Sequence, residues 1–192
     1  MTNSFIDNVK KTENALSTVL NNEEFSKLFE QLVSTSIDSL RSGGSIYIAG
    51  NGGSASQADH FAGELVGRFF IEGKSLKVFS LNANSAIITC IANDFSYDEI
   101  FSQQLSGQLD KNDLFIGLST SGSSKNIIKA IELCNKNGNN TILMTGDSDI
   151  SLNSENNLTF KVPSKNTPSI QEVHIILLHS LAEEIEKALR NK

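Results

Sequence analysis

The stretch Ser45-Ile46-Tyr47-Ile48-Ala49-Gly50-Asn51-Gly52-Gly53-Ser54 decides the fold class of this 192-residue chain. It opens with a short apolar run, rich in residues that favour β-structure, which is typical of a buried strand. A glycine-rich turn follows, and residues 55–69 have the pattern of a helix. A strand, a tight turn and a helix in this order indicate the start of an α/β fold with a parallel sheet.

The alternation of strands and helices continues along the chain. The pattern predicts further strands at 76–80, 113–118, 141–145 and 158–162, and helices at 85–92, 98–106, 125–137 and 169–189. Residues 5–42 have a helical period instead, with a break near Asn21-Asn22 and a stop at Ser42-Gly43-Gly44. We therefore predict one domain of residues 1–192: a three-layer sandwich with a central parallel sheet between helices, preceded by a helical segment at about 1–42. In such sheets, ligands bind beyond the carboxyl ends of the strands.

Composition narrows the class of protein. Hydrophobic residues make up 39% of the chain, the formal charge is −6, and no apolar run approaches the roughly 18 residues of a membrane span. The N-terminus lacks the pattern of a signal peptide, and no basic cluster stands out for nucleic acid. Cys90 and Cys134 stand alone in apolar contexts and are predicted to be buried free thiols. We expect a soluble, cytoplasmic protein that binds neither membranes nor nucleic acid.

A run of hydroxyl side chains, Ser119-Thr120-Ser121-Gly122-Ser123-Ser124, lies between a predicted strand and a predicted helix. Its hydroxyls and the free N–H groups at the helix start form an anion site, to which the helix dipole adds partial positive charge. A single serine would satisfy a helix cap, and this run exceeds that need. It contains no basic residue and no Gly-Lys-Ser/Thr of a Walker loop, so we predict a site for a phosphate monoester.

All three histidines fall in two short segments that also carry a glutamate and an amide, which suggests one site built from both ends of the chain. His60 and Glu64 are four residues apart and share a helix face, a spacing that more often means an ordinary surface pair. On the last helix, Gln171 and His179 lie loosely on one side, whereas His174 is about 140° from His179. We therefore expect His174 to be a structural or interface histidine. His179 lies among leucines, and by itself that context favours a core residue.

Taken together, these motifs resemble the phosphoheptose isomerases of the sugar isomerase (SIS) fold. The resemblance rests on Gly-Asn-Gly-Gly-Ser-x5-His-Phe-x2-Glu-Leu at 50–65, Ala-Asn-Asp at 92–94, Ser-Thr-Ser-Gly-x-Ser at 119–124 and Ile-Gln-Glu-x-His-x4-His at 170–179, and spans nearly the whole chain. It implies a homotetrameric isomerase, often zinc-dependent, that interconverts sedoheptulose 7-phosphate and D-glycero-D-manno-heptose 7-phosphate through an enediol. This reaction is the first step toward heptose for bacterial surface glycans.

The resemblance also implies roles for individual residues. The implied ligands of one Zn²⁺ per subunit are His60, Glu64, Gln171 and His179; the implied phosphate contacts are Ser119, Thr120, Ser121 and Ser124; the implied sugar contacts are Asn51, Gly52, Gly53, Asn93 and Asp94, with Glu64 and Gln171 also touching substrate. Glu64 would be the base at carbon and His179 the acid–base partner at the oxygens. Zinc would polarise the carbonyl, although a zinc-bound carboxylate is a poorer base. Arg68 and the segment around Asp94 are expected to reach a neighbouring subunit's pocket.

Two other functions fit parts of the pattern. A replication-initiator-associating protein resembles these isomerases but is a tetrameric binding protein, and it departs from them at the positions matching Glu64 and His179, both present here. An isomerase or sensor for another sugar phosphate would keep the same motifs. These motifs indicate a phosphate group and isomerase chemistry, but they say less about the length of the sugar. One departure concerns 167–169, where some relatives carry an acid and this chain has Thr-Pro-Ser. No proton relay is implied there, and Pro168 indicates the start of a helix instead.

Overall fold

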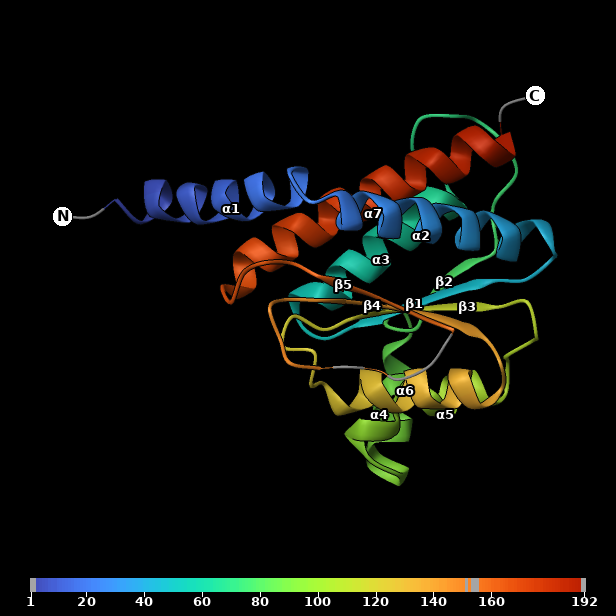
Figure 1. Cartoon of the computed structure of the whole chain (residues 1–192). Coiled ribbons are helices and arrows are strands. Elements are labelled where there is room, and N and C mark those ends of the chain that lie inside the picture. The colour runs from blue at the N-terminus through green and yellow to red at the C-terminus, as the bar shows by residue number, and fades with distance from the viewer. Residues whose placement is uncertain (1–2, 151, 153–155, 191–192) are drawn as a thin grey trace.

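A five-stranded parallel sheet forms the middle layer of the molecule in the computed structural model, which describes residues 3–150, 152 and 156–190 (Figure 1). The strands are β1 (Ile46–Gly50), β2 (Val78–Ser80), β3 (Leu114–Leu118), β4 (Asn140–Thr145) and β5 (Asn157–Lys161), in the spatial order β2-β1-β3-β4-β5. Every neighbouring pair is parallel. All residues of β1 and β3 are buried, as expected for strands covered by helices on both faces. The predicted parallel α/β architecture is confirmed.

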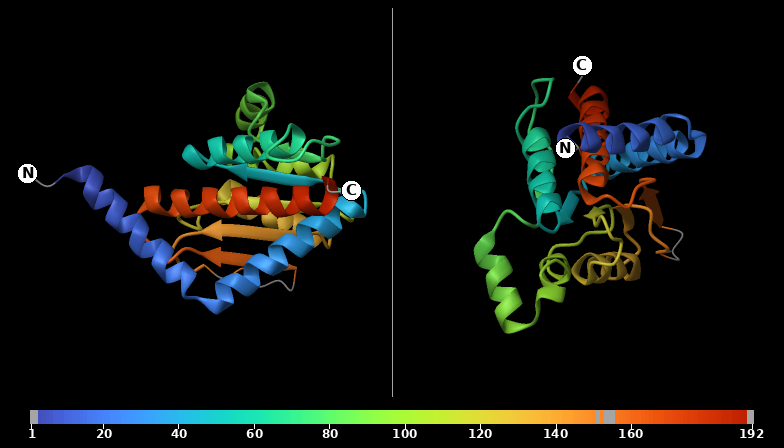
Figure 2. Two further views of the ribbon diagram at one scale, coloured as in Figure 1. Left: turned by 90° about the horizontal axis from the view of Figure 1, so that it is seen from above. Right: turned by 90° about the vertical axis from the view of Figure 1, so that its left-hand side faces the viewer.

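Helices lie on both sides of this sheet (Figures 1 and 2). One side carries α1 (Ser4–Leu20), α2 (Glu23–Arg41), α3 (Gly53–Val66) and α7 (Thr167–Arg190), and the other carries α4 (Ser85–Asp94), the 3₁₀ helix η1 (Tyr97–Glu99), α5 (Ser102–Ser106) and α6 (Lys125–Lys136). Alternate strand residues face the two sides. Ile48 and Ile116 belong to the core that contains residues of α3 and α7, whereas Tyr47 and Phe115 belong to the core that contains residues of α5 and α6.

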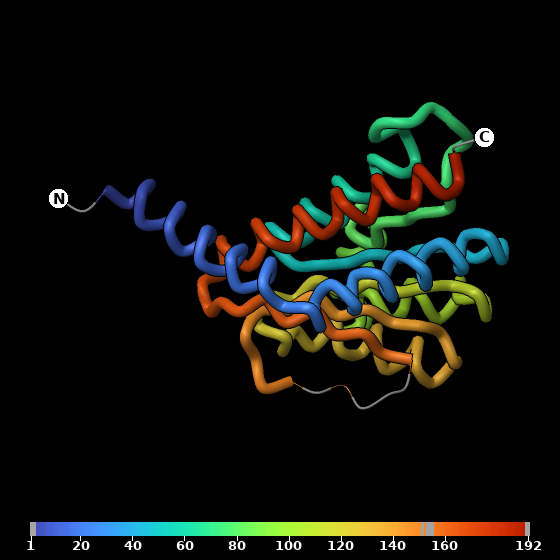
Figure 3. The backbone as a smooth tube through the Cα atoms, turned by 45° about the horizontal axis from the view of Figure 1, so that its top comes forward, coloured from blue at the N-terminus to red at the C-terminus, as the bar shows by residue number. Residues whose placement is uncertain are grey.

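The N-terminal helices divide at the predicted place. Asn22 caps α2, since its Oδ1 accepts hydrogen bonds from the N–H groups of Glu24 and Phe25. Both helices pack against α7, and α1 continues beyond the sheet so that its first turns project from the molecule (Figure 3). Those turns expose Phe5 and Ile6. The predicted start of the last helix is also confirmed, because Pro168 is the second residue of α7.

Two predicted helix boundaries are wrong, each for a local reason. The helix expected over 98–106 is divided at 100–101, between η1 and α5, where two apolar side chains are buried. The Ser102 hydroxyl donates to the Glu99 carboxylate across this break, at 2.7 Å. The helix expected to reach Phe69 ends at Val66, because the N–H groups of residues 69–71 bond to Glu186 rather than to their own helix.

The prediction for the two cysteines is half right. Cys134 is fully buried in α6, and burial raises the pKa of its thiol to about 12. Cys90 is exposed, because α4 packs on η1 and buries none of its own residues. Its thiol donates to Asp94 Oδ2 at 3.5 Å, and this hydrogen bond and the carboxylate charge raise the thiol pKa. Within the described ranges, no helix is long and apolar enough to cross a membrane.

Candidate active site

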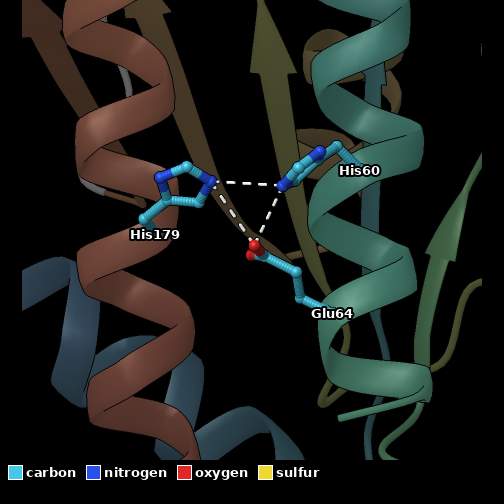
Figure 4. A group of neighbouring side chains, drawn as sticks. All are labelled: His60, Glu64 and His179. Atoms are coloured by element: carbon cyan, nitrogen blue, oxygen red, sulfur yellow. Dashed lines mark hydrogen bonds and ion pairs between the residues drawn. The ribbon is translucent and has the colours of Figure 1, made fainter. Parts of the chain in front are cut away.

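Helices from opposite ends of the chain bring His60, Glu64 and His179 together (Figure 4). Glu64 Oε1 lies 2.9 Å from His60 Nε2 and 3.4 Å from His179 Nε2. The two imidazole Nε2 atoms lie 3.1 Å apart. The histidine segments therefore meet at one place, as the sequence predicted, and three of the four expected metal ligands form this cluster, which we call the triad.

The packing of α3 against α7 positions the triad. Ala58, Phe61, Ala62 and Leu65 repeat at helical spacing and are buried, so this stripe of α3 faces the core. His60 and Glu64 lie on the neighbouring stripe, which borders α7. The His60 side chain is 52% exposed and that of Glu64 only 11%. The Glu64 carboxyl group thus lies in a partly desolvated position at the rim of the core.

The triad fits a divalent metal ion. Its three contacts need three shared protons, but each of the two Nε2 atoms carries at most one, so hydrogen bonds donated by the imidazoles do not satisfy all three. The second oxygen of Glu64, Oε2, is buried and has no hydrogen-bond partner among the described residues. Two imidazole nitrogens and one carboxylate oxygen are a donor set of catalytic zinc sites, whose tetrahedral ligand atoms lie roughly 3.3 Å apart. The observed separations of 2.9, 3.1 and 3.4 Å are close to that value.

Gln171, the fourth expected ligand, lies beside the glycine turn rather than in the triad. It precedes His179 by eight residues on α7, about 12 Å along the helix axis. Its amide donates to Ser54 Oγ at 3.3 Å, and its backbone carbonyl accepts from Gln57 Nε2 at 2.7 Å. A Cβ at Gly53 would come within 2.8 Å of that amide, so a larger residue there would displace the end of the Gln171 side chain.

The glycine turn and the hydroxyl loop are neighbours at the carboxyl edge of the sheet. They follow β1 and β3, which pair in register with Gly50 opposite Leu118. Asn51 and Asn126 join them by two reciprocal amide hydrogen bonds of 2.9 Å each. The Tyr97 hydroxyl also donates to Asn51 Oδ1, at 2.9 Å. The position of Asn126 in the first turn after the loop was a signal that sequence reasoning overlooked, whereas no local pattern connects Tyr97 to the turn.

The hydroxyl loop is preformed around its own side chains. Ser119 Oγ donates to Ser124 Oγ at 2.8 Å, and Ser123 Oγ donates to Ser121 Oγ at 3.0 Å. Gly122 allows the reversal between them with a φ of 71°. Ser124 is the N-cap residue of α6, yet its side chain makes no capping hydrogen bond. A simple cap therefore does not account for the loop, and the positive end of α6 faces it.

The remaining predicted substrate residues lie apart from the triad. Asn93 Nδ2 donates to Asp94 Oδ1 at 2.8 Å, and both residues are exposed at the end of α4, on the other side of the sheet (Figure 1). Their one described link to the carboxyl edge runs through Tyr97, three residues further on. Arg68 is likewise exposed, just beyond the end of α3. Within one chain these residues do not join the site.

His174 lies inside the protein. It is fully buried, its Nε2 is 3.3 Å from the Thr145 carbonyl oxygen, and its Nδ1 has no partner among the described residues. Burial lowers its pKa to about 4, so the ring is neutral at pH 7. Of the two roles expected for it, structural or interface, the structural one is correct.

Comparisons with known proteins agree with this geometry. A family model for the SIS domain matches residues 7–146. The phosphoheptose isomerase of Aneurinibacillus thermoaerophilus is 40% identical over 185 residues, covering 96% of this chain and 93% of the relative. The structure of a phosphoheptose isomerase from Francisella tularensis has a TM-score of 0.91 at 27% identity, covering 97% of this chain and 100% of that one. That of the Neisseria gonorrhoeae phosphoheptose isomerase has a TM-score of 0.88 at 28% identity, covering 96% and 97%.

The parallel sheet, the hydroxyl loop at its carboxyl edge and the SIS-domain match define the chain as a SIS-fold sugar-phosphate isomerase. Relatives at about 40% identity over most of the chain narrow this class further. The chain belongs to the phosphoheptose isomerase family.

Proposed function

We propose that this enzyme converts sedoheptulose 7-phosphate to D-glycero-D-manno-heptose 7-phosphate in the cytoplasm, supplying heptose for surface glycans. The observation that carries the proposal is the convergence of His60, Glu64 and His179 from two helices. Aldose–ketose isomerisation moves a proton between adjacent carbons through an enediol, and it needs a base at carbon and a proton carrier at the oxygens. A carboxylate next to an imidazole provides both groups.

Glu64 is the base at carbon in this proposal, and His179 exchanges the proton at the oxygens. Partial burial strips water from the Glu64 carboxylate, and its buried Oε2 has no hydrogen-bond partner among the described residues that would weaken the carboxylate as a base. His179 is 39% exposed, so its ring is open to a bound sugar while Nε2 points to Glu64. The two residues lie on different helices, but their functional atoms are 3.4 Å apart, so both can reach the same part of a bound sugar.

One Zn²⁺ per subunit completes the proposed site. The ligands are His60, Glu64 and His179, and Gln171 would join them if its amide leaves Ser54 and turns along α7 toward the triad. When bound, the ion supplies a Lewis acid that polarises the substrate carbonyl. Its attraction for the Glu64 carboxylate would weaken that group as a base.

The phosphate and the sugar are assigned to the carboxyl edge of the sheet. We propose that the phosphate binds Ser119, Thr120, Ser121 and Ser124, and that the sugar contacts Asn51, Gly52, Gly53, Glu64, Gln171, Asn93 and Asp94. His60 follows Gly53 by seven residues, so the triad lies about 10 Å along α3 from the glycine turn. A separation of this size suits a long, open-chain sugar phosphate better than a short one.

We infer further that the enzyme is a homotetramer. The projecting part of α1 exposes Phe5, Ile6 and Val9, and α1 lines a hollow of about 650 Å³ whose surface is mostly apolar. Helix faces of this kind are expected to pack against another subunit. Arg68 and Asp94 would then approach a neighbour's site. A fully active monomer in size-exclusion chromatography with light scattering would contradict this inference.

The test is turnover of sedoheptulose 7-phosphate before and after chelation and after zinc is added back. Glu64→Gln and His179→Gln are each expected to lower kcat about a thousandfold, whereas Glu183→Gln, the same change in an exposed ion pair with Lys187, should leave it intact. Turnover that resists chelation would support the isomerase activity but contradict a role for the metal. A zinc-loaded tetramer that acts only on pentose or hexose phosphates would contradict the proposed substrate. One that acts on no sugar phosphate would indicate a binding protein instead of an enzyme.

A further inference from the structure

A buried ion pair lies at the C-terminal end of α7. Glu186 is 0% exposed and Arg190 is 8% exposed, and their side chains are in direct contact. The Glu186 carboxylate accepts hydrogen bonds from the N–H groups of Phe69 at 3.0 Å, Phe70 at 2.7 Å and Ile71 at 2.8 Å. These three residues come directly after α3, the helix that carries His60 and Glu64.

Arg190 binds the backbone carbonyl groups of the same part of the chain. Its guanidinium donates to Leu65, Gly67, Ile71 and Lys74, with distances between 2.7 and 3.2 Å. We call Glu186 and Arg190 the latch. A buried pair that satisfies seven backbone groups has a defined geometry, and loss of one partner would leave an uncompensated charge in the interior. The latch therefore fixes the path of the chain over residues 67–74.

The charge of Glu186 is maintained by its surroundings. Burial by itself raises the pKa of the carboxyl group, but the three backbone donors and Arg190 outweigh it and lower the pKa below the usual value. The carboxylate is therefore ionised at neutral pH. An ionised carboxylate can accept all three N–H groups at once, which a neutral amide in its place could not.

Phe69, within the segment held by the latch, contacts the proposed acid–base residue His179. The rings of Phe69 and His179 are stacked, with centroids 5.6 Å apart and planes inclined by 19°. This is the offset arrangement that aromatic rings prefer. Glu186 follows His179 by seven residues and so lies on the same side of α7. One helix face therefore holds both the anchor of Phe69 and the ring that Phe69 covers.

The second ring nitrogen of His179 does not orient the imidazole. A histidine that binds metal or transfers protons is usually oriented by a hydrogen bond at its second ring nitrogen. Among the described residues, Nδ1 of His179 has no such bond, and its polar contacts are both made by Nε2. The tilted ring of His60, with its centroid 5.2 Å away, borders the imidazole on the side of the triad, and the stacked ring of Phe69 is the other ring contact that limits its rotation.

We propose that Phe69, anchored by Glu186, is a positioning residue that fixes the plane of the His179 imidazole with Nε2 toward Glu64. The inference rests on the proposed function for the role of His179, but the position of the ring is measurable without any substrate. The chain has only three histidines, so the Cε1–H groups give three NMR signals in protein labelled at histidine. His174, buried and distant from Phe69 in the sequence, is the internal reference.

The experiment compares Phe69→Leu, Phe69→Tyr and the matched control Phe70→Leu in the zinc-loaded, full-length protein. Phe70 is 66% exposed and its ring touches that of Phe69, with centroids 4.1 Å apart, so its replacement removes a neighbour of Phe69 but keeps the stacked pair of Phe69 and His179. Phe69→Leu is expected to shift the His179 signal, leave that of His174 in place, and lower kcat ten- to a hundredfold with KM within about twofold. Phe69→Tyr should restore the signal and the rate, and the control should change neither.

Glu186→Gln tests the anchor separately. It should shift the His179 signal in the same direction as Phe69→Leu, and if it does not fold, Phe69→Leu alone decides the proposal. An unchanged His179 signal in Phe69→Leu would overturn the positioning role, as would an equal shift of all three histidines. If no sedoheptulose 7-phosphate is turned over but the His179 signal moves as expected, the proposed function fails and the positioning of His179 stands.

Discussion

His174 and His179 lie five residues apart on α7, yet the helix places them in opposite surroundings. His174 is fully buried and faces the Thr145 carbonyl of β4, whereas His179 is 39% exposed and faces His60 and Glu64 of α3. Five residues rotate the helix face by about 140°, so one flank of α7 meets the sheet and the other meets α3. The role of each histidine follows from the flank on which it lies.

The two flanks also differ in what they allow chemically. On the buried flank no charged partner offsets desolvation, and the imidazole stays neutral. On the other flank a carboxylate and a second imidazole converge, which suits a proton carrier or a cation. The comparison predicts that changes at His179 affect chemistry, and that changes at His174 affect stability.

The largest expected effect is on turnover. His179→Gln should lower kcat for the proposed isomerisation about a thousandfold, because a positioned acid–base group typically contributes 10²–10⁴-fold. His174→Phe should keep turnover per folded molecule within about threefold. Steady-state kinetics on protein checked by circular dichroism measures both. Equal losses of kcat in the two variants would contradict the different roles of His174 and His179.

The next effect concerns stability in acid. His174 has a folded pKa of about 4 and an ordinary value near 6.5, so between these pH values the unfolded chain binds more protons than the folded one. Stability is therefore complete above about pH 6.5 and falls as the pH drops toward 4, by on the order of 3 kcal/mol.

Urea unfolding of the wild type and of His174→Phe across this pH range measures the effect. The difference in unfolding free energy between the two proteins should shrink or reverse as the pH falls, because only the wild type loses the histidine contribution. Other carboxylates titrate in both proteins and cancel. A difference that stays constant from pH 7 to pH 4 would contradict the buried, neutral assignment.

A smaller effect is expected on metal affinity. His179→Gln should weaken zinc binding at least tenfold, since even loss of a group behind a direct ligand weakens binding 10–100-fold. His174→Phe should bind zinc with wild-type affinity and a stoichiometry of one per chain. Competition with a zinc-sensitive dye gives both quantities. A zinc affinity that is unchanged in both variants would show that the metal binds outside the triad.

The smallest effect extends the contrast between buried and exposed positions to the cysteines. Native protein should react with a thiol reagent at one site, Cys90, although its raised pKa makes the reaction slow at neutral pH. Cys134, with a pKa of about 12 in the core, should react only after denaturation. Counting released chromophore in wild type and Cys90→Ser checks this, and two native reactive thiols would show that α6 opens readily.

Much of the site was predictable because its signals are local. The hydroxyl run between a strand and a helix indicated an anion site, and the four-residue spacing of His60 and Glu64 put both on one face of α3. The rotation between His174 and His179 could also be counted along the sequence. That the two histidine segments meet was suggested by composition, but only the packing of α3 on α7 brings the three atoms within 3.4 Å.

The features that sequence reasoning missed depend on partners far apart in the chain. Asn51 and Asn126 pair because β1 and β3 are neighbours in the sheet. Cys90 is exposed because α4 covers η1 rather than the core.

The sequence by itself determined the elements and their class, because periodicity, glycine turns and caps act over a few residues. The tertiary structure decided where α3 ends and what supports His179. Glu186 captures the N–H groups of a segment 115–117 residues earlier, and Phe69 is thereby placed on the imidazole. Such contacts stabilise the protein only once the helices are packed together, so no local sequence pattern predicts them.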